Sequence, residues 1–313
     1  MFFCLSHYAF SQDVILNSKE DASSFLGAYF SPFSETIGAG LNNGWYNTAK
    51  PHKLGGFDVS LTLNLVSFSE ENQYFNVNDL EHFTSQSNET PTIIGSGEST
   101  SITYDNGEGI LDTLTMAEQD FDIPNVPIPT LNAGIGLIKG TEVNIRYIPA
   151  YDFDISFIGE GSIELLGGGL KHDILQWIPL AEKLPFDLSV QAAFSQLKTA
   201  FQLESTNVKQ DVDIAINTST YNLIVSKKLA ILTAYASMGL NNSSFTFEGN
   251  TNIRLGSTNV LEFNVPLNMD FEKQRSFQAT TGIRLKLAIF TIHASHTFSD
   301  YPTTSAGIGI SFR

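Results

Sequence analysis

The residues best suited to acid–base or metal chemistry in this sequence are its six histidines, and their spacing argues against both roles. His293 and His296 stand three apart in an alternating stretch, so on a strand they face opposite sides and cannot share a metal ion. Ser295 also points away from His296, which makes a poor nucleophile–base pair. His172-Asp173 is half of a catalytic pair, but no motif supplies a nucleophile. We therefore expect no catalytic residues, no metal site and no cofactor, in a protein that is not an enzyme.

Two other stretches resemble ligand-binding loops without completing them. Gly134-Ile135-Gly136 lies inside an alternating run, no helix follows it, and the third glycine comes one position late for a dinucleotide loop. Asp105-Asn106-Gly107 lacks the acidic ligand at the twelfth position of a calcium loop. Neither stretch predicts a binding site.

The side chains best placed to touch a solute fall into three groups, and for each residue a purely structural role is the alternative. The first group comes from an irregular leader and would act as ligand or plug contacts: Trp45, Tyr46, Lys50 and His52. The second group consists of bases within alternating stretches, expected as lumen charges: Arg146, Arg284 and Lys286. The third group would narrow the lumen or line a lateral opening: Lys171, His172, Asp173 and Trp177.

The elements that must position these side chains are long two-faced strands, clearest at the end of the chain. Over residues 277–287 apolar side chains dominate the odd positions, and polar residues or glycine occupy the even ones. Residues 290–298 and 305–312 repeat the pattern. A period of two predicts strands with one apolar and one polar face. Runs of about ten residues suit a tilted strand that crosses a bilayer, whereas soluble strands average about five or six.

Composition supports a membrane barrel. Charged residues make up only 16% of the chain, against about a quarter in soluble proteins, and hydrophobic residues make up 42%. No uninterrupted apolar window is long enough for a membrane-spanning helix. The net charge of −16 argues against nucleic acid as a partner, because phosphates would be repelled.

The alternation predicts an all-β fold, an antiparallel transmembrane β-barrel of about 12 strands (10–14) with a short N-terminal helix and plug. The first strand is expected near residues 56–68, and a hairpin over 131–147. Weaker strands are expected at 92–94, 101–104 and 253–263. Pairing of the terminal strands would close the sheet and leave no free edge.

Three regions divide the chain. Residues 1–11 are interpreted as the remnant of a signal peptide, with small residues around Phe10 at the cleavage spacing. Its removal would take away Cys4, the only cysteine, and with it any disulfide. Residues 12–55 would form a helix, over 13–29 and ended by Pro32, followed by a plug segment. Residues 56–313 would form the barrel.

Within the barrel region, residues 69–130 are expected to be mostly a long acidic loop. They contain twelve Asp or Glu and no Lys or Arg. Carboxylates on an outer rim could hold divalent cations that bridge lipopolysaccharide phosphates. The alternative is a solvated charge run that keeps the loop soluble.

Three stretches, 41–58, 169–174 and 306–313, resemble an uncharacterised family of Gram-negative outer-membrane β-barrels. The sequence is more distantly similar to the long-chain fatty-acid transporter barrels, which also carry an N-terminal hatch and admit hydrophobic solutes. Those transporters have an Asn-Pro-Ala hatch motif where this chain reads Asn47-Thr48-Ala49. The resemblance implies the Gram-negative outer membrane, and the aromatic end at Phe312 resembles the signal read by the barrel-assembly machinery.

Together these features predict a monomeric outer-membrane barrel for passive passage or binding of a small hydrophobic solute. Its expected partners are outer-membrane lipid, lipopolysaccharide, the barrel-assembly machinery and a hydrophobic small molecule, with no nucleic acid. Two alternatives remain open: a structural or adhesion barrel with a closed lumen whose acidic loops bind a partner, and a secreted soluble β-sandwich.

Overall fold

A computed structural model describes most of the chain. The described residues are 14–16, 19–98, 100–105, 111–116, 125–155, 159–179, 181, 184–205, 208–249, 252–254, 260–263 and 267–312. The interpretation of residues 1–11 as a signal-peptide remnant lies outside them.

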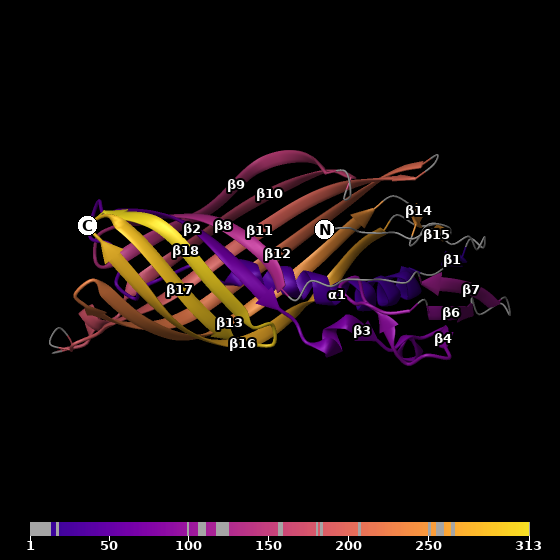
Figure 1. The fold of residues 1–313 in the computed structure, drawn as a ribbon, viewed down its shortest axis with the longest axis horizontal. Helices are drawn as coiled ribbons and strands as arrows, with labels where there is room; N and C mark the ends of the chain where they lie inside the picture. The colour runs from indigo at the N-terminus through magenta and orange to yellow at the C-terminus, as the bar shows by residue number, and fades with distance from the viewer. Residues whose placement is uncertain are drawn as a thin grey trace.

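Ten antiparallel strands form one closed ring (Figure 1). In ring order they are β2 (Phe57–Ser67), β8 (Asn125–Gly136), β9 (Thr141–Ile155), β10 (Gly159–Asp173), β11 (Asp187–Ser205), β12 (Val208–Leu229), β13 (Leu232–Gly249), β16 (Leu267–Leu287), β17 (Phe290–Phe298) and β18 (Thr303–Phe312). The last strand pairs with the first, from Thr303 opposite Val66 to Phe312 opposite Phe57. The predicted antiparallel barrel is confirmed, and its sheet has no free edge along the ring.

The alternation read from the sequence separates the two faces of the wall. On β2, Thr62 and Asn64 are fully buried inside the ring, whereas Leu61 is 52% exposed and Leu63 is 41% exposed. The other strands alternate in the same way, with exposed leucine, isoleucine and phenylalanine outside. Their buried inner side chains are polar over much of the wall and apolar at the long-loop end. A single closed sheet with apolar side chains outward contradicts the soluble β-sandwich, which needs two sheets pressed together on their apolar faces.

The ring has ten strands rather than the expected number of about 12, and none of the three weaker predicted strands belongs to it. Residues 92–94 are not in a strand, and 101–104 falls within β6 (Thr100–Asp105), which pairs outside the ring. The 253–263 stretch forms β14 (Asn252–Arg254) and β15 (Val260–Phe263). These two make a separate three-stranded sheet with β1 (Val14–Leu16).

The two ends of the ring differ. At one end, which we call the short-turn end, two-residue turns join β12 to β13 and β16 to β17, and Ala230 and Ala288 there have φ of 55°. The described chain segments at the opposite, long-loop end include 68–98, 100–105, 111–116, 252–254 and 260–263. Short turns on one side and long loops on the other are typical of outer-membrane barrels.

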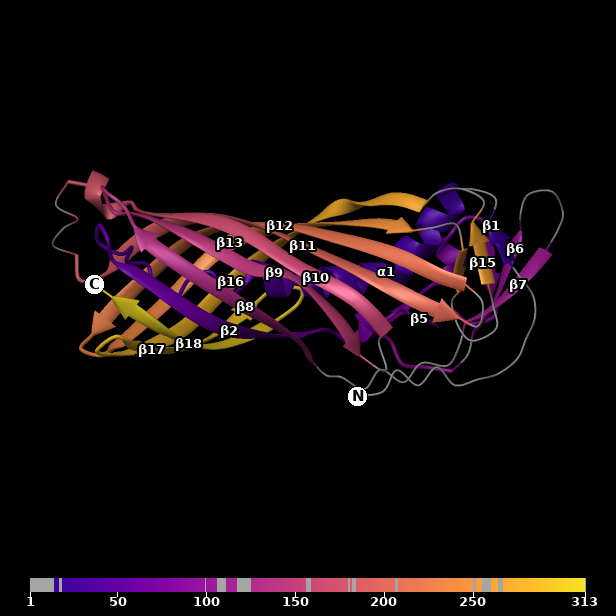
Figure 2. The same ribbon diagram turned by 90° about the horizontal axis from the view of Figure 1, so that it is seen from above.

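The wall is tall on one side and low on the other. Strands β11, β12, β13 and β16 run for 18 to 22 residues, but β17, β18 and β2 run for only 9 to 11. Beyond the long-loop end lies a small folded unit, residues 70–98, 100–105 and 111–116, which we call the cap (Figures 1 and 2). The region expected as a long acidic loop is therefore partly ordered.

The cap consists of short elements. They are η1 (Glu70–Gln73), β3 (Tyr74–Phe75), η2 (Val77–Asp79), β4 (Phe83–Ser85), β5 (Thr90–Pro91), β6 and β7 (Leu111–Met116). Strand β3 pairs with β5, and β4, β6 and β7 form a three-stranded sheet.

Helix α1 (Lys19–Asn42) lies inside the ring and extends beyond it at the long-loop end (Figure 2). The sequence predicted a helix over 13–29 that Pro32 would end. The observed helix begins six residues later and continues past Pro32 to Asn42. Proline has no N–H, so the carbonyl of Ala28 loses its donor within the helix. The Thr36 hydroxyl donates to the Pro32 carbonyl at 2.7 Å. None of the described helices is long and apolar enough to cross a membrane.

Close packing of α1 against the wall depends on glycine. A Cβ added at Gly38 would lie 2.7 Å from the Ser243 Cβ, and one at Gly40 would lie 2.2 Å from the Ile128 Cδ1. Two glycines one half-turn apart therefore let the helix backbone approach strands on two sides of the ring.

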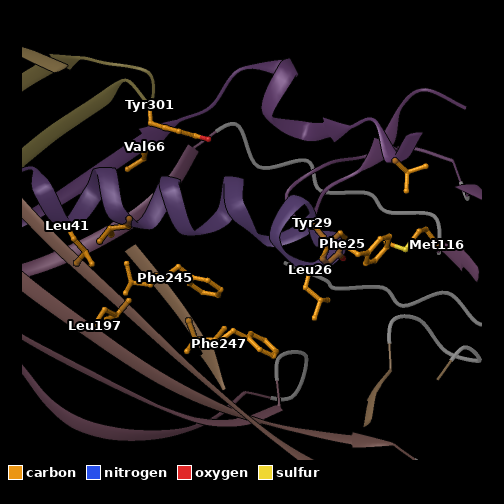
Figure 3. Packing of buried hydrophobic residues seen from close by; sticks show 14 of the residues in the cluster. Phe25, Leu26, Tyr29, Leu41, Val66, Met116, Leu197, Phe245, Phe247 and Tyr301 are labelled. Atoms are coloured by element: carbon orange, nitrogen blue, oxygen red, sulfur yellow. The ribbon is translucent and has the colours of Figure 1, made fainter. Parts of the chain in front are cut away.

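One hydrophobic core joins helix, wall and cap at the long-loop end (Figure 3). The helix contributes Phe25, Leu26 and Tyr29, and the wall contributes Phe245 and Phe247 among others. The cap completes this core from the low side of the wall, and its Phe83 ring stacks on Phe25 at 5.3 Å. Burial of these apolar side chains stabilises the helix in its place inside the ring.

Candidate functional site

After α1 the chain runs on inside the ring as an irregular segment, residues 43–56, which we call the luminal segment. It leads from the helix end to the start of β2. Trp45 is buried there, and its indole Nε1 donates to the Leu41 carbonyl at 3.1 Å. The Tyr46 hydroxyl bonds the Ser237 hydroxyl on β13, and its ring meets Tyr235 edge-on at 6.1 Å. Both aromatic candidates thus lie within the ring.

Arg146, on β9, is the fully buried base that holds the end of the helix. Its two terminal nitrogens donate to the carbonyls of Leu41 at 2.5 Å and Asn43 at 2.8 Å. Its Nε donates to Asn132 Oδ1 on β8 at 2.8 Å. The last carbonyls of a helix have no partner within it and carry partial negative charge, so a guanidinium is well suited to this place.

A second buried contact sits nearer the short-turn end. The Lys171 amine on β10 lies 2.9 Å from Glu142 Oε1 on β9, and both side chains are almost fully buried. The other carboxylate oxygen, Oε2, accepts from the His52 backbone N–H at 2.8 Å. Lys171 also lies 3.5 Å from the Thr48 carbonyl. This ion pair therefore binds the luminal segment to the wall at two points.

The two remaining leader candidates bind wall carboxylates close to the same end. The His52 Nε2 lies 2.9 Å from Asp58 Oδ1 at the start of β2. The Lys50 amine lies 3.3 Å from Asp187 Oδ1 at the start of β11, and 63% of its side chain is exposed. Of the leader candidates, Lys50 is the most exposed, since Trp45 is buried and Tyr46 and His52 are partly buried.

The glycines of β8 that resembled a nucleotide loop have a packing role instead. A Cβ on Gly136 would lie 2.2 Å from the Lys53 carbonyl oxygen and 2.4 Å from that of His52. The Gly136 N–H donates to the Gly56 carbonyl, and the Gly136 carbonyl accepts from the Gly55 N–H. The luminal segment thus lies directly on the bare backbone of β8.

The four residues expected to narrow the lumen do not act as one group. Lys171 faces inward, as described above. The neighbouring His172 faces outward, because side chains alternate along a strand, and its Nε2 accepts from the Trp177 indole at 2.9 Å. Trp177, in η3 (Leu175–Trp177), is 64% exposed, and Asp173 accepts from the Leu175 N–H at 2.9 Å. The four residues therefore do not form one constriction: Lys171 faces the lumen, whereas Trp177 is exposed beside the outward-facing His172.

Of the two other expected lumen charges, Arg284 is buried on the inner face of β16. Lys286, two residues nearer the short-turn end, is half-buried, and its amine donates to the Ser311 hydroxyl at 3.0 Å. Arg284 has no hydrogen-bond or ion-pair partner among the described residues.

Sequence reasoning missed the contacts that tie the cap to the helix. His82 Nδ1 lies 2.9 Å from Asp21 Oδ1, and the Tyr104 hydroxyl donates to Asp21 Oδ2 at 3.0 Å. On the low side of the wall, the Tyr301 hydroxyl donates to Glu35 Oε2 at 2.8 Å. Asp21 and Glu35 stand in a helical stretch without a local pattern, so the sequence gives no signal for these partners.

The cap also carries an open groove of about 760 Å³. Its lining is rich in hydroxyl and carboxylate groups, among them Thr84, Ser101, Glu89 and Glu98. Among the described residues no three His, Cys, Asp or Glu side chains are placed to hold a metal ion.

The fold and its interior define a class: a closed ten-stranded antiparallel barrel with apolar side chains outward and its own N-terminal helix inside. The chain matches the model of a family of unknown function (DUF6588) over residues 1–312 and belongs to that family. No curated protein sequence matches it.

Among solved structures, the chain is similar to the translocator domain of the autotransporter NalP from Neisseria meningitidis, with 9% identity, 93% of this chain and 98% of that chain covered, and a TM-score of 0.35. It is similar to the attachment invasion locus protein Ail of Yersinia pestis, with 10% identity, coverage of 83% and 98%, and a TM-score of 0.31. For the toluene transporter TbuX of Ralstonia pickettii the identity is 12%, the coverage 83% and 90%, and the TM-score 0.27. These likenesses are remote and carry no functional assignment.

Proposed function

We propose that this protein is an outer-membrane barrel that passes a small hydrophobic solute, with its luminal segment acting as a movable plug. The observation that carries the proposal is the polar character of the contacts between that segment and the wall. Hydrogen bonds such as Tyr46–Ser237 and Thr48–Ser226 can be exchanged for bonds to water when the segment moves. The outward apolar face supports a membrane location, because water would not favour so many exposed leucine, isoleucine and phenylalanine side chains.

The remaining parts of the proposal concern place and partners. We place the protein in the Gram-negative outer membrane as a monomer, exported through a signal peptide and inserted by the barrel-assembly machinery. Its surroundings would be outer-membrane lipid and lipopolysaccharide. Phe312 at the end of β18 packs beside Phe57, with ring centres 5.9 Å apart.

A second candidate function is a barrel whose lumen stays closed and whose cap binds a partner. The continuous hydrophobic core at the long-loop end favours it, because moving α1 would expose Phe25 and Leu26 to water. The open groove in the cap offers a surface for such a partner.

An engineered disulfide separates the two functions. The hydroxyls of Thr48 and Ser226 are 3.2 Å apart, so Thr48→Cys with Ser226→Cys would tie the luminal segment to β12. The matched control, Gln196→Cys with Asn217→Cys, joins directly paired residues of β11 and β12 without touching that segment.

Solute uptake is measured in vesicles that contain the full chain, with Cys4 replaced by serine. If the plug moves, oxidation of the first pair stops uptake, reduction restores it, and the control pair has no effect in either state. Uptake that continues in the oxidised first pair contradicts a movable plug. No uptake by the wild-type protein under any condition supports the closed barrel instead.

A further inference from the structure

The inner wall near the short-turn end holds a buried guanidinium without an acceptor. Arg284 is only 8% exposed, and its Nε makes no hydrogen bond. Among the described residues it also has no ion-pair partner within 4.0 Å. An ionised group in such a place is costly unless something compensates its charge.

Two neighbouring side chains also have a buried polar atom without a hydrogen-bond partner. His293, directly opposite Arg284 on β17, is buried with an unpartnered Nδ1, while its Nε2 lies 3.2 Å from the Thr62 hydroxyl. The Tyr235 hydroxyl on β13 is buried beside Ser295 and makes no hydrogen bond of normal geometry. Three polar groups on three adjacent strands thus have unused hydrogen-bonding capacity.

Glycines make room for the two rings. A Cβ on Gly282 would lie 2.4 Å from the Tyr235 ring, and one on Gly307 would lie 2.4 Å from the His293 ring. Each ring therefore lies against bare backbone on its side of Arg284. Glycines at these two wall positions are therefore required by the places of the Tyr235 and His293 rings.

The charges around the cluster leave the guanidinium uncompensated at short range. Asp58 and Glu142 are near enough to attract Arg284 electrostatically, but Asp58 bonds His52 and Glu142 bonds Lys171. Lys286 adds a second positive charge nearer the short-turn end.

We infer that Arg284, His293 and Tyr235 form a binding site for a small monovalent anion of the carboxylate type. The guanidinium supplies a planar pair of donors for a carboxylate, and the phenol and imidazole supply further hydrogen bonds. The two nearby carboxylates disfavour a larger negative charge. This site goes beyond the proposed passage of a hydrophobic solute and does not depend on plug movement.

The test uses fluoroacetate as the carboxylate probe and ¹⁹F line broadening with the full detergent-solubilised chain, in competition with acetate. We expect Arg284→Gln to weaken binding at least about tenfold, because a charge-assisted pair is lost. Arg275→Gln, the same change at an exposed position of the same strand, should leave binding unchanged. Arg284→Lys keeps the charge but loses the fork, and should bind with intermediate affinity.

Thermal unfolding gives a second readout that does not require each variant to bind. At constant ionic strength, acetate should raise the melting temperature of the wild-type protein but not that of Arg284→Gln. The site would be overturned if the wild type and Arg284→Gln broadened the fluoroacetate signal equally, or if acetate changed the melting temperature of neither protein. Water would then be the occupant. Loss of the acetate effect in Arg275→Gln alone would also overturn the site. If Asp58→Asn bound acetate and the wild type did not, Arg284 would be paired with Asp58 in the wild type. That result would also overturn the site.

Discussion

The guanidinium carbon of Arg146 lies 4.0 Å from the centre of the Trp45 ring. The same side chain donates to the Leu41 and Asn43 carbonyls, so one wall residue contacts the helix end and the turn that follows it. A cation over an indole face gains free energy most when both are desolvated, as they are here. Arg146 therefore joins the wall to the N-terminal part of the chain at the middle of the structure.

Replacing Arg146 should destabilise the barrel strongly. In Arg146→Met the Asn43 carbonyl and the Asn132 amide oxygen lose their donor, at about 1–3 kcal/mol for each group left unpaired, while the Leu41 carbonyl keeps the Trp45 indole as a donor. Relief of the buried charge offsets part of this loss, so we expect a net cost of about 3 kcal/mol or more. Urea unfolding in detergent measures it. Arg275→Met, on the exposed part of β16, should change stability by less than about 0.5 kcal/mol, and an equal effect of both variants would contradict the role of Arg146.

The Glu142–Lys171 pair should behave as a buried ion pair. Glu142→Gln leaves the Lys171 charge unmatched and should cost about 3–5 kcal/mol. The double variant with Lys171→Met should recover a large part of that cost, which a double-mutant cycle of unfolding free energies would reveal. Lys50→Met, at an exposed pair, should cost at most about 1 kcal/mol. Additive single effects at Glu142 and Lys171 would exclude the coupling.

Gly136 should not tolerate a methyl group. Gly136→Ala places a Cβ against the carbonyls of His52 and Lys53, and backbone cannot yield as a flexible side chain does. We expect the luminal segment to shift and protease cleavage within residues 43–56 to accelerate. The matched control is Gly168→Ala on β10, where the nearest atom would be 4.0 Å away and no change is expected. Unaltered cleavage in Gly136→Ala would mean that the segment does not rest on β8.

Attachment of the cap should depend on pH through His82. A hydrogen bond to Asp21 and the attraction of that carboxylate raise the pKa of His82, and Glu81 and Asp105 add to the shift. A raised pKa means that the contact is complete below the ordinary value of about 6.5 and is lost as pH rises through the folded-state value. Because the imidazole is solvent-exposed, we expect a small effect.

Hydrogen exchange of the β4 amides, corrected for intrinsic rates, measures this effect. Protection should fall between about pH 6 and about pH 8 in the wild-type protein. His82→Gln should abolish the pH dependence, and an identical pH profile in the variant would rule out His82 as its cause.

The wall could be read from the sequence because it follows a local rule. A period of two in side-chain polarity fixes the strand and its two faces along much of the wall, but at the long-loop end the inner face is apolar too, as at Phe245 and Phe247. The strand count could not be fixed the same way. Residues 101–104 and 260–263 alternate as wall strands do, but they pair in small sheets at the long-loop end.

The interior was less accessible to sequence reasoning. Arg146 contacts Leu41, which lies more than a hundred residues away in the sequence, and no local pattern around either residue predicts that contact. The separation of Lys171 from Trp177 depends on where β10 ends, which a short kinked stretch does not reveal. Pro32 predicted the end of the helix, but the helix continues to Asn42, ten residues further, because it packs inside the ring.

The direction of α1 has a consequence for how the molecule is made. The helix runs from the long-loop end inward, and β1 pairs with β15 outside the ring at that end. The last strand of the ring, β18, pairs with the first, β2, and the ring that they close surrounds a helix of the same chain. During assembly α1 is therefore either in position before β18 joins β2, or it enters afterwards, along the axis of the barrel or through a gap between those two strands.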